Sequence, residues 1–428
     1  MISIAPVRFL LPAAIVFFAM VAVFAGNWPN FRGPTFDGSN TETGLPIEIS
    51  KTDHLVWNTE LVGLGSSTPA VWGKSVFITS LNTDQTGVVA IKINLQSGKI
   101  EWQKEFSSAE RNDRRSDMAG PSPTTDGTNA IFISGAGDLV CYGFDGSEKW
   151  KKNLQKDYGK FSLKWTYSSS PMLYEGTLYI QVLQRNNPSY LLALDPKSGK
   201  EKWKHIRECK AVSESQEAYS SPIPISHDGR KEIVVAGADC ITGHSLKDGE
   251  ERWRWETWNS KRITDLRVVP CPVYGDEMIV AGAPKGRPIY SLFAGSGEGV
   301  NPGVLKWKSH RVQVSCDVTT PLYHNGYFYI LNGRKKVLSC VDPYSGRIEW
   351  SHAIPAMAKI EASPTAADGK IYFMSQTGEF FVYRASPRYE LLHSCVLGQD
   401  PEATNRATVV PAQGRLLIRL GKELWCMD

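Results

Sequence analysis

The spacing of a glycine and a tryptophan constrains the fold of this chain more than any other feature. Glycine, three residues and then tryptophan recur six times, at Gly98/Trp102, Gly146/Trp150, Gly199/Trp203, Gly249/Trp253, Gly303/Trp307 and Gly346/Trp350. The clearest copy, residues 193–203, reads Ala-Leu-Asp-Pro-Lys-Ser-Gly-Lys-Glu-Lys-Trp, the end of an apolar strand, a tight turn and a returning strand. Such a unit cannot bury its apolar face alone, so the spacing predicts a chain of packed repeats.

A second signal marks where each unit begins. It is a small or hydroxyl-bearing residue before Pro, a Gly within three to seven residues, and then alternating apolar residues. It occurs at Thr68-Pro69, Ser122-Pro123, Ser170-Pro171, Ser221-Pro222, Cys271-Pro272, Thr320-Pro321, Ser363-Pro364 and Val410-Pro411. The intervals of 54, 48, 51, 50, 49, 43 and 47 residues suit one four-stranded blade each. In the third unit, strands are expected over residues 168–173, 177–182, 190–194 and 200–203, and no capped helix is expected in the chain.

The eighth unit stops after its third strand, whereas the run 55–61 has the sequence of a tryptophan-bearing fourth strand without a unit before it. The fold predicted is therefore all-β, an eight-bladed β-propeller of four-stranded blades whose ring is closed by the N-terminal strand completing the last blade. The series that begins at Trp57 would continue after Trp350 at His393, which gives eight outer strands. An open stack of units is the alternative, but it does not explain the displaced strand.

Three regions are expected: a signal peptide over residues 1–25, an irregular lead-in over 26–54, and the propeller over 55–428. Arg8 precedes an apolar run from Phe9 to Phe24, and Val23 and Ala25 provide small residues at a cleavage site. We therefore expect export to the periplasm or cell envelope. The competing interpretation is an uncleaved anchor, which would be the one membrane contact of the chain.

Charge and cysteine content narrow the partners and the chemistry. With 48 basic and 44 acidic residues, the net charge of +4 gives no global field for nucleic acid. Among the eight cysteines, Cys141 and Cys340 occupy the repeat slot of Ala193, and Cys271 precedes a unit-starting Pro. We expect free buried thiols, with one disulfide among the remaining cysteines left open.

The stretch 193–203 resembles the tryptophan-docking repeat of pyrroloquinoline-quinone (PQQ)-type eight-bladed propellers, and residues 340–350 match that repeat nearly as well. The resemblance covers about residues 55–428, and residues 28–38 are similar to the lead-in of secreted quinoprotein-like propellers. The resemblance implies a superfamily of quinoprotein dehydrogenases and cofactor-free propellers, including the propeller subunit of the outer-membrane β-barrel assembly machine.

Within that superfamily, the dehydrogenases have an adjacent Cys-Cys pair near the quinone and calcium ligands that include Glu, Asn and Asp. No two cysteines are adjacent in this chain, and no segment matches the motifs of the catalytic or calcium-binding carboxylates. The resemblance is therefore closer to the cofactor-free propellers. It implies no resident cofactor, with PQQ and calcium expected only if the chain is a divergent dehydrogenase.

Long connections locate a candidate binding face. Pro123 lies 21 positions after Trp102, and Pro171 lies 21 positions after Trp150. Such long connections should share one end of the ring with the turns between second and third strands. Basic and aromatic residues gather in these loops, and the predicted partner-binding residues are Arg111, Arg114, Arg115, Trp165, Arg185, Trp255, Trp258, Arg262 and Arg287. Arg267, Lys285, Arg334, Lys335 and Lys336 belong to the same loops, in which ordinary solvated charge is the alternative.

The sequence thus predicts an exported, monomeric, non-catalytic scaffold that binds an envelope protein or an acidic, peptide-like ligand through arginine forks and tryptophan anchors. The alternative is a divergent PQQ-dependent quinoprotein dehydrogenase that oxidises an alcohol or a sugar. A propeller that senses a small molecule stays open as a third class.

Overall fold

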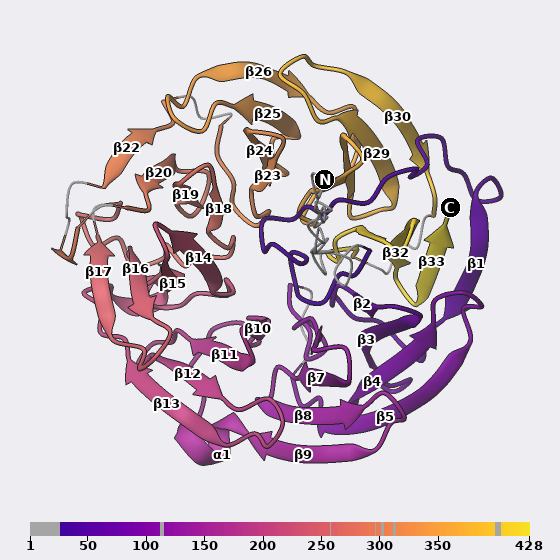
Figure 1. Cartoon of the computed structure of the whole chain (residues 1–428), viewed down its shortest axis with the longest axis horizontal. Helices are drawn as coiled ribbons and strands as arrows, with labels where there is room; N and C mark the ends of the chain where they lie inside the picture. The colour runs from indigo at the N-terminus through magenta and orange to yellow at the C-terminus, as the bar shows by residue number, and fades with distance from the viewer. Residues whose placement is uncertain are drawn as a thin grey trace, which may run out of the picture.

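Eight antiparallel sheets stand around a central axis and form a closed ring (Figure 1). The computed structural model describes residues 26–111, 115–256, 258–295, 297–300, 304–310, 314–398 and 404–428. The predicted signal peptide, residues 1–25, lies outside the described residues, and so do Arg114 and Gly303. The ring confirms the predicted eight-bladed propeller.

The first four blades follow the order of the chain, each from the innermost strand outward. Blade 1 holds β2 (Ala70–Trp72), β3 (Ser75–Leu81), β4 (Gly87–Asn94) and β5 (Ile100–Ser108). Blade 2 holds β6 (Thr124–Thr125), β7 (Asn129–Ile133), β8 (Asp138–Gly143) and β9 (Glu148–Asn153). Blade 3 holds β10 (Met172–Tyr174), β11 (Thr177–Val182), β12 (Tyr190–Leu194) and β13 (Glu201–Ile206). Blade 4 holds β14 (Ile223–His227), β15 (Arg230–Gly237), β16 (Cys240–Ser245) and β17 (Glu251–Trp255), and β21 (Gly299–Val300) pairs in parallel with β17.

The last four blades complete the circle. Blade 5 holds β18 (Val273–Gly275), β19 (Met278–Gly282), β20 (Ile289–Phe293) and β22 (Leu305–Lys308). Blade 6 holds β23 (Leu322–His324), β24 (Tyr327–Asn332), β25 (Val337–Val341) and β26 (Ile348–Ala353). Blade 7 holds β27 (Thr365–Ala367), β28 (Lys370–Met374), β29 (Glu379–Arg384) and β30 (Leu391–Val396). Blade 8 holds β31 (Val410–Ala412), β32 (Arg415–Leu420) and β33 (Glu423–Met427).

The N-terminal strand β1 (Leu55–Glu60) supplies the outer strand of blade 8. It runs antiparallel to β33, with Asn58 opposite Trp425 and Glu60 opposite Glu423. The predicted closure is therefore confirmed, and it covers the edge that β33 would otherwise expose. His393 lies on β30, the outer strand of blade 7, as the tryptophan series predicts.

Two details differ from the expectations. A one-turn helix, α1 (Leu154–Tyr158), is capped by the Asn153 side chain, which accepts a hydrogen bond from the backbone N–H of Lys156, and a 3₁₀ helix, η1, spans Ser213–Gln216. The prediction of no capped helix is therefore wrong, because a single capped turn carries too little periodicity to stand out in a sequence. Neither helix among the described residues is long and apolar enough to cross a membrane.

Tryptophans of the repeat join neighbouring blades. Six indole N–H groups donate to a backbone carbonyl of the next blade at 2.7–3.1 Å, in the pairs Trp57–Leu95, Trp102–Phe144, Trp150–Pro196, Trp203–Leu246, Trp307–Pro343 and Trp350–Ser386. Five of these indoles, all but Trp350, pack on a turn glycine of the next blade; a Cβ added at Gly199, for example, would lie 2.7 Å from the Trp150 ring. This inter-blade contact requires the glycine and explains the fixed spacing.

Trp253 departs from the pattern because the residue opposite it on the neighbouring strand has no side chain. The residue opposite it on β16 is Gly243, where the other blades have residues such as Ala193 or Cys141. The indole turns over this glycine and donates to the Glu232 carboxylate of its own blade at 2.8 Å.

Residues 26–40, here called the strap, cross one end of the channel along the inner strands. The strap is irregular, as predicted, yet largely buried: the Trp28 backbone pairs with Val71 in blade 1 at 2.9 Å in both directions, and the Asn40 amide donates to the Pro411 carbonyl in blade 8 at 2.6 Å. Asn30 accepts from the backbone of Leu173 in blade 3 at 3.0 Å. The strap therefore ties together blades that are far apart in the chain, and its ribbon crosses the middle of the ring (Figure 1).

Candidate functional site

The unit starts form a hydrogen-bonded ring around the axis, here called the belt. Its members are Thr68, Ser122, Ser170, Ser221, Cys271, Thr320, Ser363 and Thr408. In seven links, the backbone N–H of one member donates to the side chain of a neighbouring member at 2.8–3.1 Å. Small side chains with an acceptor atom are therefore required at these positions.

The eighth member shows where the sequence signal misplaces a unit start. Thr408 precedes β31 by two residues, as Ser363 precedes β27, and its backbone N–H donates to Thr68 at 3.1 Å. The motif Val410-Pro411 lies inside β31 instead. In blade 8 the proline thus stands two residues beyond its usual place.

A cavity of about 810 Å³, here called the well, extends from the belt to the open end of the channel. Phe31 of the strap lines it together with all belt members, so the strap closes its floor. The volume lies within the range of about 300–1,000 Å³ that is typical of ligand sites. The loops from each outer strand to the next blade, and the turns between second and third strands, meet at its mouth: Lys285 donates its backbone N–H to Asp317 at 2.9 Å, and Ile360 donates to the Gly333 carbonyl at 3.1 Å. The predicted sharing of one face is confirmed.

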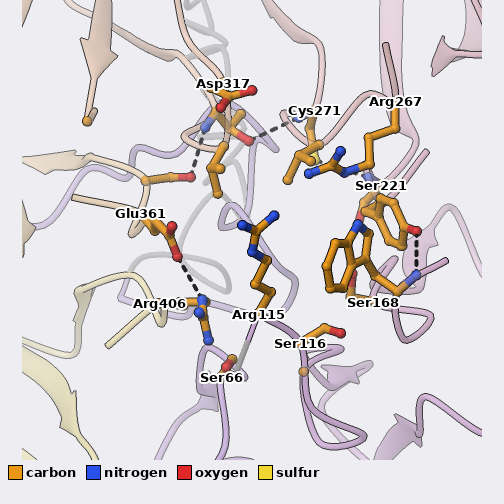
Figure 2. Close-up of a pocket in the computed structure, with 18 of the residues that line it drawn as sticks. Ser66, Arg115, Ser116, Ser168, Ser221, Arg267, Cys271, Asp317, Glu361 and Arg406 are labelled. Carbon is orange, nitrogen blue, oxygen red and sulfur yellow. Dashed lines mark hydrogen bonds and ion pairs between the residues drawn. The ribbon is translucent and has the colours of Figure 1, made fainter. Parts of the chain in front are cut away.

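The mouth is charged, with basic side chains in excess. Its basic residues are Arg115, Lys164, Arg267, Lys285, Arg334, Lys359 and Arg406, and its acidic residues are Asp117, Glu214, Asp265, Asp317 and Glu361. Several acids are paired: Glu214 contacts Lys164 at 2.7 Å and Arg267 at 2.5 Å. Glu361 pairs with Arg406 at 2.8 Å (Figure 2). Lys285 pairs with Asp265.

These contacts favour the ionised form of the acids. Desolvation alone would raise the pKa of Glu214, but the hydrogen bond from Lys164 and the charge of Arg267 outweigh it, and the pKa lies below its ordinary value. The hydrogen bond from Lys285 likewise lowers the pKa of Asp265. In contrast, Arg334 and Lys359 are exposed, and within the described part of the chain no carboxylate forms an ion pair with either.

Trp165 forms an aromatic wall at the mouth. The guanidinium carbons of Arg115 and Arg267 lie 5.1 and 5.7 Å from its ring centroid, and the Lys164 ammonium lies 5.7 Å away, distances typical of cation–π contacts. Arg115 points into the middle of the well (Figure 2). The indole N–H of Trp165 is buried and has no partner among the described residues.

The other predicted site residues lie in different places and make different contacts. Arg111 donates to the backbone carbonyls of Leu163 and Lys164, so it holds the loop that carries Trp165. Arg185 pairs with the buried Glu217 at 2.7 Å. Arg262 lies 3.5 Å from Asp239, Arg287 is half-buried in the turn between β19 and β20, and Arg114 lies outside the described residues.

Trp255 and Trp258 correct the prediction. They are 4% and 6% exposed, and both pack against Tyr290 in the core between blades 4 and 5, so they are not surface anchors. Sequence reasoning also missed the acid Glu361 and the arginine Arg406, since nothing in a loop sequence shows which charges meet at a mouth.

Three overlapping matches, over residues 39–160, 112–287 and 182–386, identify the family model described as outer membrane protein assembly factor BamB. The chain belongs to this family. A search of curated protein sequences finds no match for this BamB-family chain.

Solved structures agree on the fold alone, because the identities are low. BamB from Moraxella catarrhalis aligns with a TM-score of 0.60 at 12% identity, over 87% of this chain and 99% of that one. Quinohemoprotein alcohol dehydrogenase from Comamonas testosteroni aligns with a TM-score of 0.67 at 12% identity, over 95% of this chain and 81% of that one. The computationally designed Ika8 protein aligns with a TM-score of 0.59 at 10% identity, over 87% of this chain and 99% of that one.

Proposed function

We propose that this BamB-family chain is an exported, non-catalytic propeller of the cell envelope that binds an acidic, peptide-like segment of a partner protein at the mouth of the well. The observation that carries the proposal is the excess of basic side chains around an open well, with Arg334 and Lys359 exposed and without a carboxylate partner in the described chain. Arginine and lysine in such positions attract carboxylates. The family description as an outer membrane protein assembly factor supports the envelope and a protein partner.

The donor set supports a role without a quinone and calcium. Calcium takes six to eight oxygen ligands, commonly from several carboxylates that its own charge compensates. At this mouth, Glu214, Glu361 and Asp265 each already face a basic side chain of the chain itself. Among the described residues, no group of three or more His, Cys, Asp or Glu side chains is placed to hold a metal ion. In the proposed function, these three paired acids are therefore not calcium ligands.

A binding measurement with defined peptides tests the proposal. The labelled probe is a decapeptide of alternating Glu and Ser, and its counterpart has Lys in place of Glu. Fluorescence anisotropy should detect the acidic peptide only. The R334S/K359S variant should bind about tenfold more weakly, because two exposed charge contacts of about 0.7 kcal/mol each would be lost.

The matched control removes the same charge elsewhere. Lys149 and Lys200 are exposed near the outer rim of blades 2 and 3, so K149S/K200S should keep the affinity of the unaltered protein. Equal weakening in both variants would mean that only the net charge matters. Equal binding of the Glu and Lys peptides would refute the proposal.

The non-catalytic part has a separate test. Purified protein should show no quinone absorbance and no dye-linked oxidation of alcohols or sugars, before or after addition of pyrroloquinoline quinone and calcium. Activity that appears after this addition would establish the dehydrogenase alternative.

A further inference from the structure

The excess positive charge of this chain is concentrated at one edge of the ring. Residues 145–160 and 195–206, here called the rim patch, include β9, α1, the turn after β12, and β13. They hold nine lysines, five acidic residues and no arginine. The other 39 basic and 39 acidic residues of the chain's 48 and 44 balance each other, so the rim patch accounts for the net charge of +4.

The far side of the ring lacks this charge. β26, β30 and β1, the outer strands of blades 6, 7 and 8, carry neither lysine nor arginine. In Figure 1, β9, β13 and α1 form the outer edge across the ring from β26 and β30. A charge distribution of this kind turns the edge of blades 2 and 3 towards a negatively charged surface.

The short helix α1 brings lysines of two blades together. Its last residue, Tyr158, has the Lys152 ammonium of blade 2 at 5.4 Å from its ring centroid and the Lys204 ammonium of blade 3 at 5.2 Å. Both distances are typical of cation–π contacts. The Tyr158 hydroxyl also donates to Glu201 of blade 3 at 2.8 Å, so the helix holds the two blade edges in one patch.

A groove of about 460 Å³ runs between blades 2 and 3 within the rim patch. Its lining includes four lysines, Lys151, Lys152, Lys156 and Lys200. Lys152 pairs with Asp157 at 2.9 Å. Lys156 and Lys200 are exposed, and their ammonium groups have no partner among the described residues. These two charges are therefore available to an external anion.

The residue types of the rim patch favour a lipid surface over a nucleic acid or a protein. Nucleic acids are commonly held by arginine and by aromatic side chains that stack on bases, and protein interfaces are enriched in Trp, Tyr and Arg and depleted in Lys. The rim patch has no arginine, and Trp150, Tyr158 and Trp203 are half-buried in contacts with the next blade. Clustered lysines are instead attracted to anionic bilayers, where a diffuse negative charge needs no fixed donor geometry.

We propose that the rim patch docks on a bilayer that contains anionic phospholipids, with Lys156 and Lys200 at the contact. In this orientation the ring stands on its edge, and the mouth of the well stays accessible to a partner segment. The contact is separate from residues 1–25, for which an anchor is the alternative prediction. It is also independent of the proposed peptide binding at the mouth.

Co-sedimentation of the full chain with vesicles tests the inference. One set of vesicles contains phosphatidylcholine alone, and the other contains phosphatidylcholine and phosphatidylglycerol in about a 2:1 ratio. The unaltered protein should bind the anionic vesicles about tenfold more strongly or better, and added salt should weaken this binding. The neutral set shows how much residues 1–25 contribute. Equal binding to both sets would overturn the inference.

Variants of the unpartnered lysines locate the contact. K156S/K200S should weaken binding to the anionic vesicles by about tenfold or more, since each lysine near such a surface contributes about fivefold. It should keep the melting temperature, because neither ammonium group has a partner in the described fold. K156R/K200R retains the charge and should bind the vesicles as the unaltered protein does.

The matched control removes the same charge at the mouth. R334S/K359S should bind the anionic vesicles within about twofold of the unaltered protein. An equal loss in this variant, or unchanged binding in K156S/K200S, would overturn the placement of the contact. If the acidic decapeptide or a labelled oligonucleotide depends on Lys156 and Lys200 and the vesicles do not, the rim patch contacts another class of partner and membrane docking fails. Peptide binding that fails while the vesicle result holds would overturn the proposed function alone.

Discussion

Replacement of Gly199 by Ala tests whether the repeat glycine is required by the tryptophan of the neighbouring blade or only by its backbone. Gly199 has a φ of +67°, and a Cβ there would lie 2.7 Å from the Trp150 ring. Gly176, in the same blade, has the same φ of +67°, but a Cβ there would have nothing within 4 Å. The pair therefore separates steric contact from backbone strain.

The magnitudes follow from these two environments. The left-handed backbone costs an alanine about 1–2 kcal/mol, and this cost is common to both positions. Overpacking adds about 1–3 kcal/mol, and only Gly199 faces it. G176A should lower the free energy of unfolding by about 1–2 kcal/mol, and G199A by about 2–5 kcal/mol.

Urea unfolding followed by tryptophan fluorescence and circular dichroism measures both variants. In a W150A background, the additional cost of G199A should disappear, because the ring that it clashes with has been removed. Equal midpoints for G176A and G199A would refute the reasoning. So would an additional cost that persists without Trp150.

Three further predictions concern closure, pH and thiols. W57F removes the hydrogen bond from Trp57 to the Leu95 carbonyl of the next blade and should lower the free energy of unfolding by about 1 kcal/mol, whereas W57A should lower it by about 3–5 kcal/mol. A melting temperature unchanged in W57A would contradict the role of this strand. Burial and the charge of Arg207 lower the pKa of His244 from 6.5 to about 3, so the unfolded chain takes up the proton first, and the free energy of unfolding should fall as the pH drops from about 6.5 towards 3. The H244Q variant should lose part of this pH dependence, which urea titrations at several pH values would measure. All eight cysteines are free, and six are buried whereas Cys209 and Cys395 are half-buried, so a thiol reagent should count eight thiols in urea without reductant and at most two in the native protein. A count of six in urea would reveal the disulfide that the sequence left open.

The repeats made the architecture predictable. The strands β11 and β12 have the predicted bounds, because alternating apolar residues and turn glycines determine them locally. β10 starts later than predicted, at Met172, because the residues before it belong to the belt and face the axis instead of pairing. The displaced strand at Trp57 was predictable because a unit without a fourth strand leaves an edge to be filled.

The candidate site was less predictable, because it depends on which loops meet. Trp255 and Trp258 look like exposed loop aromatics in the sequence, but both are buried against Tyr290. Arg32 lies in a segment without strand periodicity, and its position beneath the belt can be seen only in the folded structure. The large apolar side chains of Trp28 and Phe36 in that segment were the available sign that it is buried rather than a loose lead-in.

The strap also constrains the order in which the molecule assembles. Trp28 and Arg32 are synthesised before every blade, yet Arg32 bonds to the carbonyls of Pro321 and Pro364, and β1 needs β33. The earliest part of the chain therefore reaches its final place only after the last blade exists. Blades joined by local hairpins form quickly, whereas contacts between distant parts of a chain form slowly. Until the strap and β1 dock, the edge of β33 has no partner strand and the channel is not covered by the strap. The interval between synthesis and docking is therefore when this chain is most exposed to aggregation.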